Sequence, residues 1–403
     1  MSKFKILLFA ILILFNFNAY SETLVSSQNS PNVNSKKILN FANTVGIKIK
    51  QSLKNAKTKK QRHAVINYQQ SNYKFVLNAE NNADAQILVD CSAWVSNVLA
   101  NTFPDLYKQM MLLSESGMQK YYKAKSKEDE IQDETDIDIE DTDNNATSTP
   151  QAESIDDQDF DDPENQDESI SDPDLVKYGE EGIKGTLRAY VWFNIFNEIL
   201  RSRNARPFAD INAWVKTTTP EMMKEALKKN LFPDGGTYNP GQKSVLMSQK
   251  VKSYKKRYNY FQFMQTPEWK ANLDAIANNW SVFKYVKNWR KGDIIAVLYK
   301  WNKFKIEHAI KESTGHVMLM VSDPKKIIKK KKTYYEFWVM DSAGGPKIDD
   351  KIRKKGDSGV GIGKIIVATD KDGYARGWKH IYKKWYDIDG KILAGRLRDN
   401  VVS

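Results

Sequence analysis

The chain has 403 residues, of which 41% are hydrophobic, and is long enough to bury a large core. Its 62 Lys and Arg residues outnumber its 50 Asp and Glu residues, and a net charge of +12 favours anionic partners. The single cysteine, Cys91, excludes an internal disulfide, and beyond the first residues no stretch is apolar enough to cross a membrane.

The first residues have the pattern of a secretory signal peptide. Lys3 and Lys5 precede a short apolar run at 6–15, and small residues at Ala19 and Ser21 suit cleavage after Ser21. The sequence therefore predicts a signal peptide over 1–21 and a mature protein that is periplasmic or secreted, without a stable membrane anchor. The alternative is an uncleaved anchoring segment.

Cys91 is predicted to open a helix. After a polar leader at 22–36 and a helical stretch at 37–70, Asp90 suits a helix N-cap. An apolar stripe with helical spacing then continues to about Thr102: Cys91, Trp94, Val95, Val98, Leu99. A helix N-terminus should lower the pKa of the thiol, while the charge of Asp90 opposes this, so a nucleophile here also needs a basic partner. Equally, Cys91 could be a small core residue.

An acidic segment follows a helix predicted at 105–127. Residues 128–174 hold 21 acidic side chains and no Lys or Arg, which predicts disorder. Without this segment 62 basic residues face 29 acidic ones, a formal charge of +33. The segment is either a spacer in a surface loop or an internal mask for a basic surface.

The later part of the chain changes from helices to strands. Helices are expected at 186–201, 220–230 and 267–287. Short apolar runs then predict antiparallel strands at 294–298, 317–321, 335–340, 365–368 and 392–397. Helices followed by strands indicate the α+β class.

Two of these strands supply a candidate base and a carboxylate. His316 begins one strand and Asp341 ends the next, so a hairpin around the Lys-rich loop at 325–332 would bring the two side chains together. Set against Cys91, they form the arrangement of a nucleophilic triad. Taken singly, His316 could be an ordinary strand-end residue and Asp341 a turn former.

Lysine-rich runs elsewhere favour an acidic polymer or nucleic acid as a partner. They lie at 54–62, 250–257, 325–332 and 351–355, with aromatic residues interleaved at 254–261. The simpler interpretation is a set of solvated faces. The sequence shows no ligand spacing for zinc, and we read His63, His308 and His380 as structural or surface residues.

Three motifs together resemble the NlpC-type, papain-like cysteine hydrolases of bacterial cell walls. Asp90-Cys91-Ser92-Ala93-Trp94-Val95 is similar to the Asp-Cys-Ser-Gly-aromatic-Val run of that family, although Ala93 replaces the usual glycine. Lys291-Gly292-Asp293-Ile294 resembles its Gly-Asp-Leu strand start, and Gly315-His316-Val317 its His-Val strand.

The resemblance implies a papain-like core, with Cys91 as nucleophile, His316 as base and Asp341 as the residue that orients it. The implied organisation is N-terminal helices and the cysteine helix at 22–104, an insertion at 105–290 (mostly helical over 180–290) and a C-terminal sheet at 291–403. The implied substrate is an amide bond in peptidoglycan or another envelope molecule, cleaved without cofactor or metal. The backbone N–H of Cys91 would stabilise the oxyanion. The alternatives are a basic binding protein without catalysis and an acyltransferase of the same fold.

Overall fold

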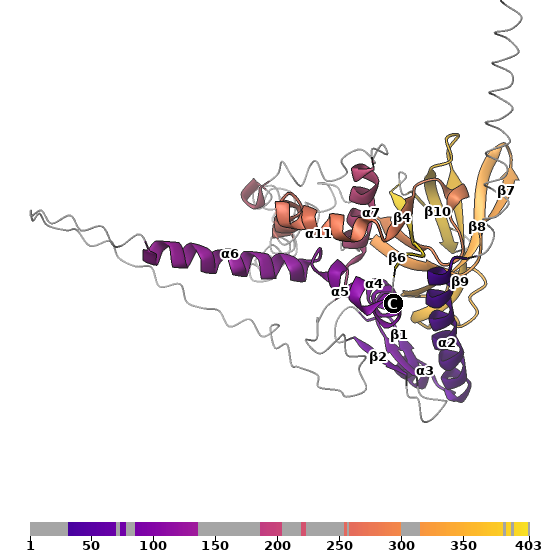
Figure 1. Cartoon of the computed structure of the whole chain (residues 1–403). Helices are drawn as coiled ribbons and strands as arrows, with labels where there is room; N and C mark the ends of the chain where they lie inside the picture. Colours follow the sequence, from indigo (N-terminus) through magenta and orange to yellow (C-terminus); the bar gives the residue numbers. More distant parts are fainter. Residues whose placement is uncertain are drawn as a thin grey trace, which may run out of the picture.

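Helices pack against one large antiparallel sheet in a computed structural model of the chain (Figure 1). The structure describes residues 31–69, 73–77, 85–135, 186–203, 219–222, 254–255, 258–299, 315–381, 384–387 and 391–401. The arrangement confirms the α+β class.

The large sheet contains nine strands, all paired antiparallel. Its order is β11-β10-β9-β8-β6-β5-β12-β4, and β7 pairs with β8 beside this path. The strands are β4 (Trp280–Phe283), β5 (Ile294–Leu298), β6 (Gly315–Met320), β7 (Lys325–Lys329), β8 (Lys332–Ala343), β9 (Gly359–Thr369), β10 (Ala375–Ile381), β11 (Lys384–Asp387) and β12 (Ile392–Leu397). All five predicted strands lie in this sheet.

A small second sheet leads into the cysteine helix. It has the order β1-β3-β2 and contains β1 (Ile66–Asn67), β2 (Lys74–Leu77) and β3 (Ala85–Leu88). This sheet was not predicted from the sequence, because its strands are only two to four residues long. Arg62 connects the same region to the large sheet through an ion pair with Asp357.

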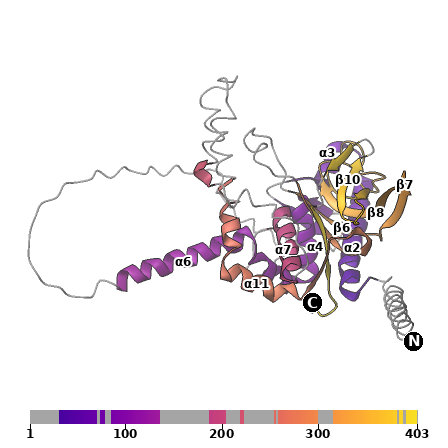
Figure 2. The same cartoon turned by 90° about the horizontal axis from the view of Figure 1, so that it is seen from above.

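The described helices include α2 (Val33–Asn55), α3 (Lys59–Val65), α4 (Cys91–Thr102), α5 (Pro104–Met111), α6 (Glu115–Thr135), α7 (Ala189–Ser202) and α11 (Pro267–Ala277). Helices α2, α4 and α7 lie along the sheet, whereas α6 projects from the body on the side away from β7 (Figures 1 and 2). Within the described residues, no helix is both long and apolar enough to span a membrane.

Helix α7 belongs to the core. Trp192 and Phe196 are fully buried, and Trp192 packs edge-on against Trp280 of β4. Strand β4 pairs with β12, so the sheet extends outside the expected range of 291–403. Residues within 105–290 therefore build part of the main core, whereas we had expected an insertion beside the cleft.

Four local predictions were wrong in detail. The helix expected over 267–287 ends at Ala277, and residues 280–283 form strand β4 instead. The helix expected over 37–70 ends at Asn55, because Thr58 caps a new helix with a reciprocal hydrogen bond to Gln61. The helix expected to end at 127 continues to Thr135, inside the acidic segment. A Lys-rich loop was expected at 325–332. Residues 325–329 instead form β7, and a two-residue turn connects β7 to β8, with which it pairs.

The signal peptide, the acidic segment from 136 to 174, His308 and most of the helix predicted at 220–230 lie outside the described residues.

The two faces of the sheet bury separate clusters. Val317, Leu319 and Met340 face the helices and join the larger hydrophobic cluster. Met318 and Trp378 belong to a second cluster on the opposite face. Strand β6 and the Asp341 end of β8 are thus buried on both faces, which holds their side chains rigidly.

Candidate functional site

Cys91 occupies the first position of α4, as predicted. The Asp90 side chain caps the helix by accepting hydrogen bonds from the Ala93 amide at 2.7 Å and the Ser92 hydroxyl at 2.8 Å. Tyr73 of the small sheet donates a third bond to Asp90 at 2.8 Å. At this position the N–H of Cys91 has no acceptor within the helix.

Contacts on both sides of Cys91 fix it against β8. The Ser342 hydroxyl donates to the Val89 carbonyl at 2.5 Å, and the Trp94 indole N–H donates to the Met340 carbonyl at 3.3 Å. Ser342 and Met340 flank Asp341. The sequence around the cysteine is therefore fastened to the residues on either side of the predicted carboxylate.

His316 and Asp341 meet as predicted. Strands β6 and β8 pair antiparallel, with Leu319 opposite Met340, and this register puts His316 and Asp341 on the same sheet face as diagonal neighbours. The Nε2 atom of His316 is hydrogen-bonded to Oδ2 of Asp341. Both side chains are buried.

The thiol approaches β6 from the helix side. It lies near the backbone of Val317, the residue after His316, and near the backbone of Ser92. It also lies within electrostatic range of Asp341. The structure thus brings His316 and Asp341 together and places the Cys91 thiol at the backbone beside them. The side chains of His316 and Asp341 themselves lie on the sheet face shared with Met318 and Trp378, opposite the face that α4 covers.

The pKa of the thiol does not fall as predicted. Burial, Asp90 and Asp341 raise the pKa of Cys91 to about 12, although backbone groups of Val317 and Ser92 oppose the rise. Helix-terminal donors are outweighed because Cys91 is only 4% exposed and has carboxylates nearby. Cys91 in this structure is a neutral thiol, so any activation must come from a base that takes its proton.

Two buried cations share the Asp341 carboxylate with His316. Lys347 Nζ lies 2.9 Å from Oδ2, the same oxygen that binds His316, and Arg353 Nη2 lies 3.1 Å from Oδ1. Arg353 also forms a 2.7 Å ion pair with Asp350. We call these five residues, His316, Asp341, Lys347, Asp350 and Arg353, the carboxylate cluster.

The carboxylate cluster sets the protonation states of His316 and Asp341. Burial would raise the pKa of Asp341, but Lys347, Arg353 and His316 hold it well below its usual range. Burial lowers the pKa of His316; Asp341 opposes this, and Lys347 and Arg353 reinforce it. A neutral imidazole must donate Nε2–H to the ionised Asp341, which can only accept, so its free base is Nδ1.

The sequence pattern did not predict the partners of Asp341. Lys347 and Arg353 lie in a charged, turn-rich stretch of the kind that is usually exposed, and the pattern gives no sign of their burial. His380, which we had read as structural or surface, packs against Trp378 with ring centroids 4.8 Å apart, and Trp378 in turn contacts His316. Burial lowers the pKa of His380 to about 3.

The Gly-Asp motif has a structural role in this fold. Asp293 is fully buried and accepts hydrogen bonds from Arg396 of β12 at 2.7 and 2.9 Å. Gly292 has a φ of +93°, and a Cβ there would lie 2.5 Å from the Cβ of Ser35. The motif therefore joins β5 to β12 and α2, at a distance from His316 and Asp341.

Within the described residues, no group of three His, Cys, Asp or Glu side chains could hold a metal ion. Comparison with known proteins adds no assignment: no family model, no curated protein and no solved structure matches the chain.

Proposed function

We propose that the chain is a cysteine hydrolase that cleaves a peptide or amide bond through Cys91, His316 and Asp341. One observation carries the proposal. The only thiol in the chain starts a helix and lies near the backbone of Val317, the residue after a histidine whose Nε2 atom is held by a buried carboxylate. The motif resemblance supports an NlpC-type, papain-like core.

The chemistry begins from neutral groups. His316 Nδ1 takes the thiol proton as the Cys91 sulfur attacks the carbonyl carbon, and Asp341 stabilises the imidazolium that forms. The backbone N–H of Cys91, which has no acceptor within the helix, would stabilise the oxyanion. The imidazolium then protonates the leaving amine as the C–N bond breaks, leaving a thioester on Cys91. Water, deprotonated by His316, hydrolyses the thioester to a carboxylic acid and restores the thiol.

Peptidoglycan stem peptides are the substrate class that we propose, with action in the periplasm or outside the cell. The resemblance to wall hydrolases and the signal-peptide pattern at 1–21 support this choice. A purely hydrolytic enzyme yields free carboxylates without an added acceptor, which separates it from an acyltransferase of the same fold.

The test is incubation of purified protein with isolated peptidoglycan, followed by mass spectrometry of the released fragments. Wild type should release peptides with new carboxyl termini, and Cys91→Ser and His316→Ala should not. Release by the Cys91→Ser variant at the wild-type rate would refute the proposal. Release only in the presence of an amine acceptor would assign a transferase instead.

A further inference from the structure

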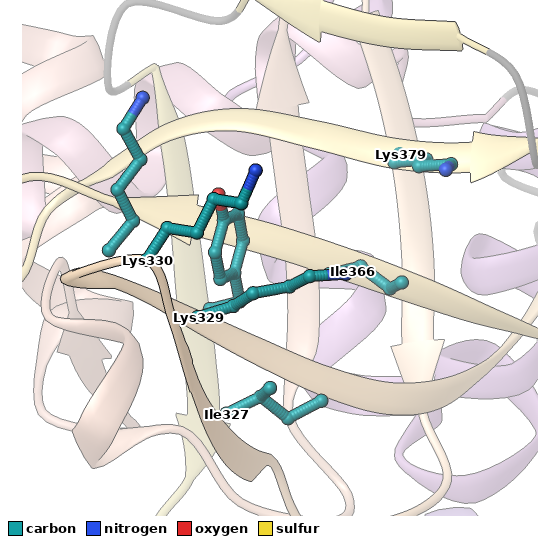
Figure 3. A pocket seen from close by; sticks show the side chains of 7 residues that line it. Ile327, Lys329, Lys330, Ile366 and Lys379 are labelled. Atoms are coloured by element: carbon teal, nitrogen blue, oxygen red, sulfur yellow. The ribbon is translucent and has the colours of Figure 1, made fainter.

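The hairpin of β7 and β8 forms one wall of a hollow lined by lysines. Its volume is about 500 Å³, and the lining residues are Ile327, Lys329, Lys330, Lys332, Tyr334, Ile366 and Lys379. We call this set the lysine hollow. Side chains from the hairpin, β9 and β10 surround it, with no Asp or Glu in the lining (Figure 3).

Strand register explains why these residues share one face. Ile327 pairs with Tyr334, Lys329 pairs with Lys332, and Ile366 of β9 pairs with Lys379 of β10. The alternate residues of these strands, including Tyr335, Val367 and Trp378, are buried on the other face. The hollow is therefore the outer surface of a sheet whose inner surface is packed.

Two features of the hairpin work against its own stability. Lys329 and Lys332 lie directly opposite each other, and like charges in that position repel. Lys330 and Lys331 have φ values of 50° and 60°, the left-handed region that a two-residue turn of this type normally fills with Asn-Gly. An anion held among these lysines would offset the charge repulsion.

We propose that the lysine hollow binds an anionic sugar polymer. Lysines supply charge at its rim, while Ile327, Ile366 and Tyr334 supply an apolar floor against which the C–H faces of sugar rings can pack.

Other occupants fit less well. Nucleic acid binding usually uses several open aromatic faces, but Tyr334 is the one aromatic side chain in the lining. Trp338 is covered by the ammonium groups of Lys351 and Lys364, 5.0 and 5.4 Å from its ring centre. The acidic segment of the chain itself begins in α6, which projects away from β7 in both views (Figures 1 and 2).

The proposal can be tested by binding measurements on the full-length protein with polygalacturonate, which carries one carboxylate per sugar. Lys329→Gln/Lys332→Gln/Lys379→Gln should weaken binding on the order of tenfold at low ionic strength and flatten its salt dependence. The control Lys50→Gln/Lys54→Gln/Lys120→Gln removes the same charge from α2 and α6 and should weaken binding much less. Circular dichroism and thermal unfolding would show that both triple variants fold.

Three results would overturn the proposal. Equal losses in the two triple variants would show attraction by net charge alone. Equal binding of the methyl-esterified polymer would show that the lysines do not recognise carboxylates. Tighter binding of single-stranded DNA through the same lysines would assign a different class of partner. None of these results depends on Cys91, so hydrolysis can fail or succeed independently.

Discussion

Positively charged side chains lie at both ends of strand β8, but they are buried at one end and exposed at the other. At Asp341 the buried Lys347 and Arg353 each contact a carboxylate, and the pairs are closed from solvent. At Tyr334 the lysines of the hollow are gathered without any carboxylate in the lining. Burial explains the contrast, because an unpaired charge is very costly inside a protein and cheap in water. Lys347 and Arg353 can therefore shift the pKa values of His316 and Asp341, whereas the lysines of the hollow can bind a partner.

The largest effect is expected from breaking the inner pairs. Asp341→Asn leaves Lys347 and Arg353 without their shared charge, so the free energy of unfolding should fall by about 3 kcal/mol or more. Glu336→Gln, on the same strand but partly exposed and paired with Lys364, should cost less than about 1 kcal/mol. Urea unfolding of both variants measures the contrast, and equal costs would contradict it.

Acid should also destabilise the protein through His380. Its folded pKa is lowered from 6.5 to about 3, so the unfolded chain binds the extra proton between those values. The stability is complete above pH 6.5 and is lost as pH falls toward 3, on the order of a few kcal/mol. His380→Phe keeps a ring against Trp378 and should flatten this part of the stability profile. An unchanged slope would remove His380 from the account.

Lys347 should set the acid limb of activity. It disfavours the imidazolium of His316, so Lys347→Met should raise the pKa of His316, and activity should be lost at a higher pH than in wild type. Lys379→Met in the lysine hollow is the matched control and should leave the acid limb in place. The measurement is the pH profile of kcat/KM. A fall in kcat/KM without a shift of the limb would leave Lys347 with a structural role alone.

The smallest effect is expected at the turn of the β7–β8 hairpin. Lys330→Asn/Lys331→Gly relieves two left-handed lysines and should raise the free energy of unfolding by about 1–2 kcal/mol. The same change removes a lysine from the hollow and should weaken polygalacturonate binding. Thermal unfolding and binding assays would show this opposition, and a gain in both properties would contradict it.

The sequence predicts the parts of this molecule that depend on local pattern. The cap at Asp90, the span of α4 and strands β5 and β12 follow from spacing alone, and antiparallel order is enough to bring His316 to Asp341. The sequence does not predict which charged side chains are buried. Whether Lys347 is buried or Lys329 exposed depends on the fold around each lysine, and the two stand in equally charged surroundings in the sequence.

The same dependence on the fold explains why the pKa of the Cys91 thiol is not predicted by the sequence. A helix N-terminus predicts a lowered pKa for Cys91, but the pKa is set by burial and by carboxylates, one of which is 250 residues away in the chain. The structure therefore has a neutral thiol in place of the predicted thiolate. In the proposed mechanism His316 takes the proton of this thiol, whereas an inert core cysteine would stay protonated and unreactive.

The most direct test follows the modification of Cys91 by iodoacetamide under native conditions, using intact mass, across a range of pH. We expect that wild type reacts while folded, that the rate rises with pH without a low-pH plateau, and that His316→Ala slows it by about tenfold or more. Thermal unfolding measured alongside confirms that both proteins stay folded. Reaction that occurs only on unfolding, at one rate in both proteins, would identify Cys91 as a core residue and contradict the proposed mechanism.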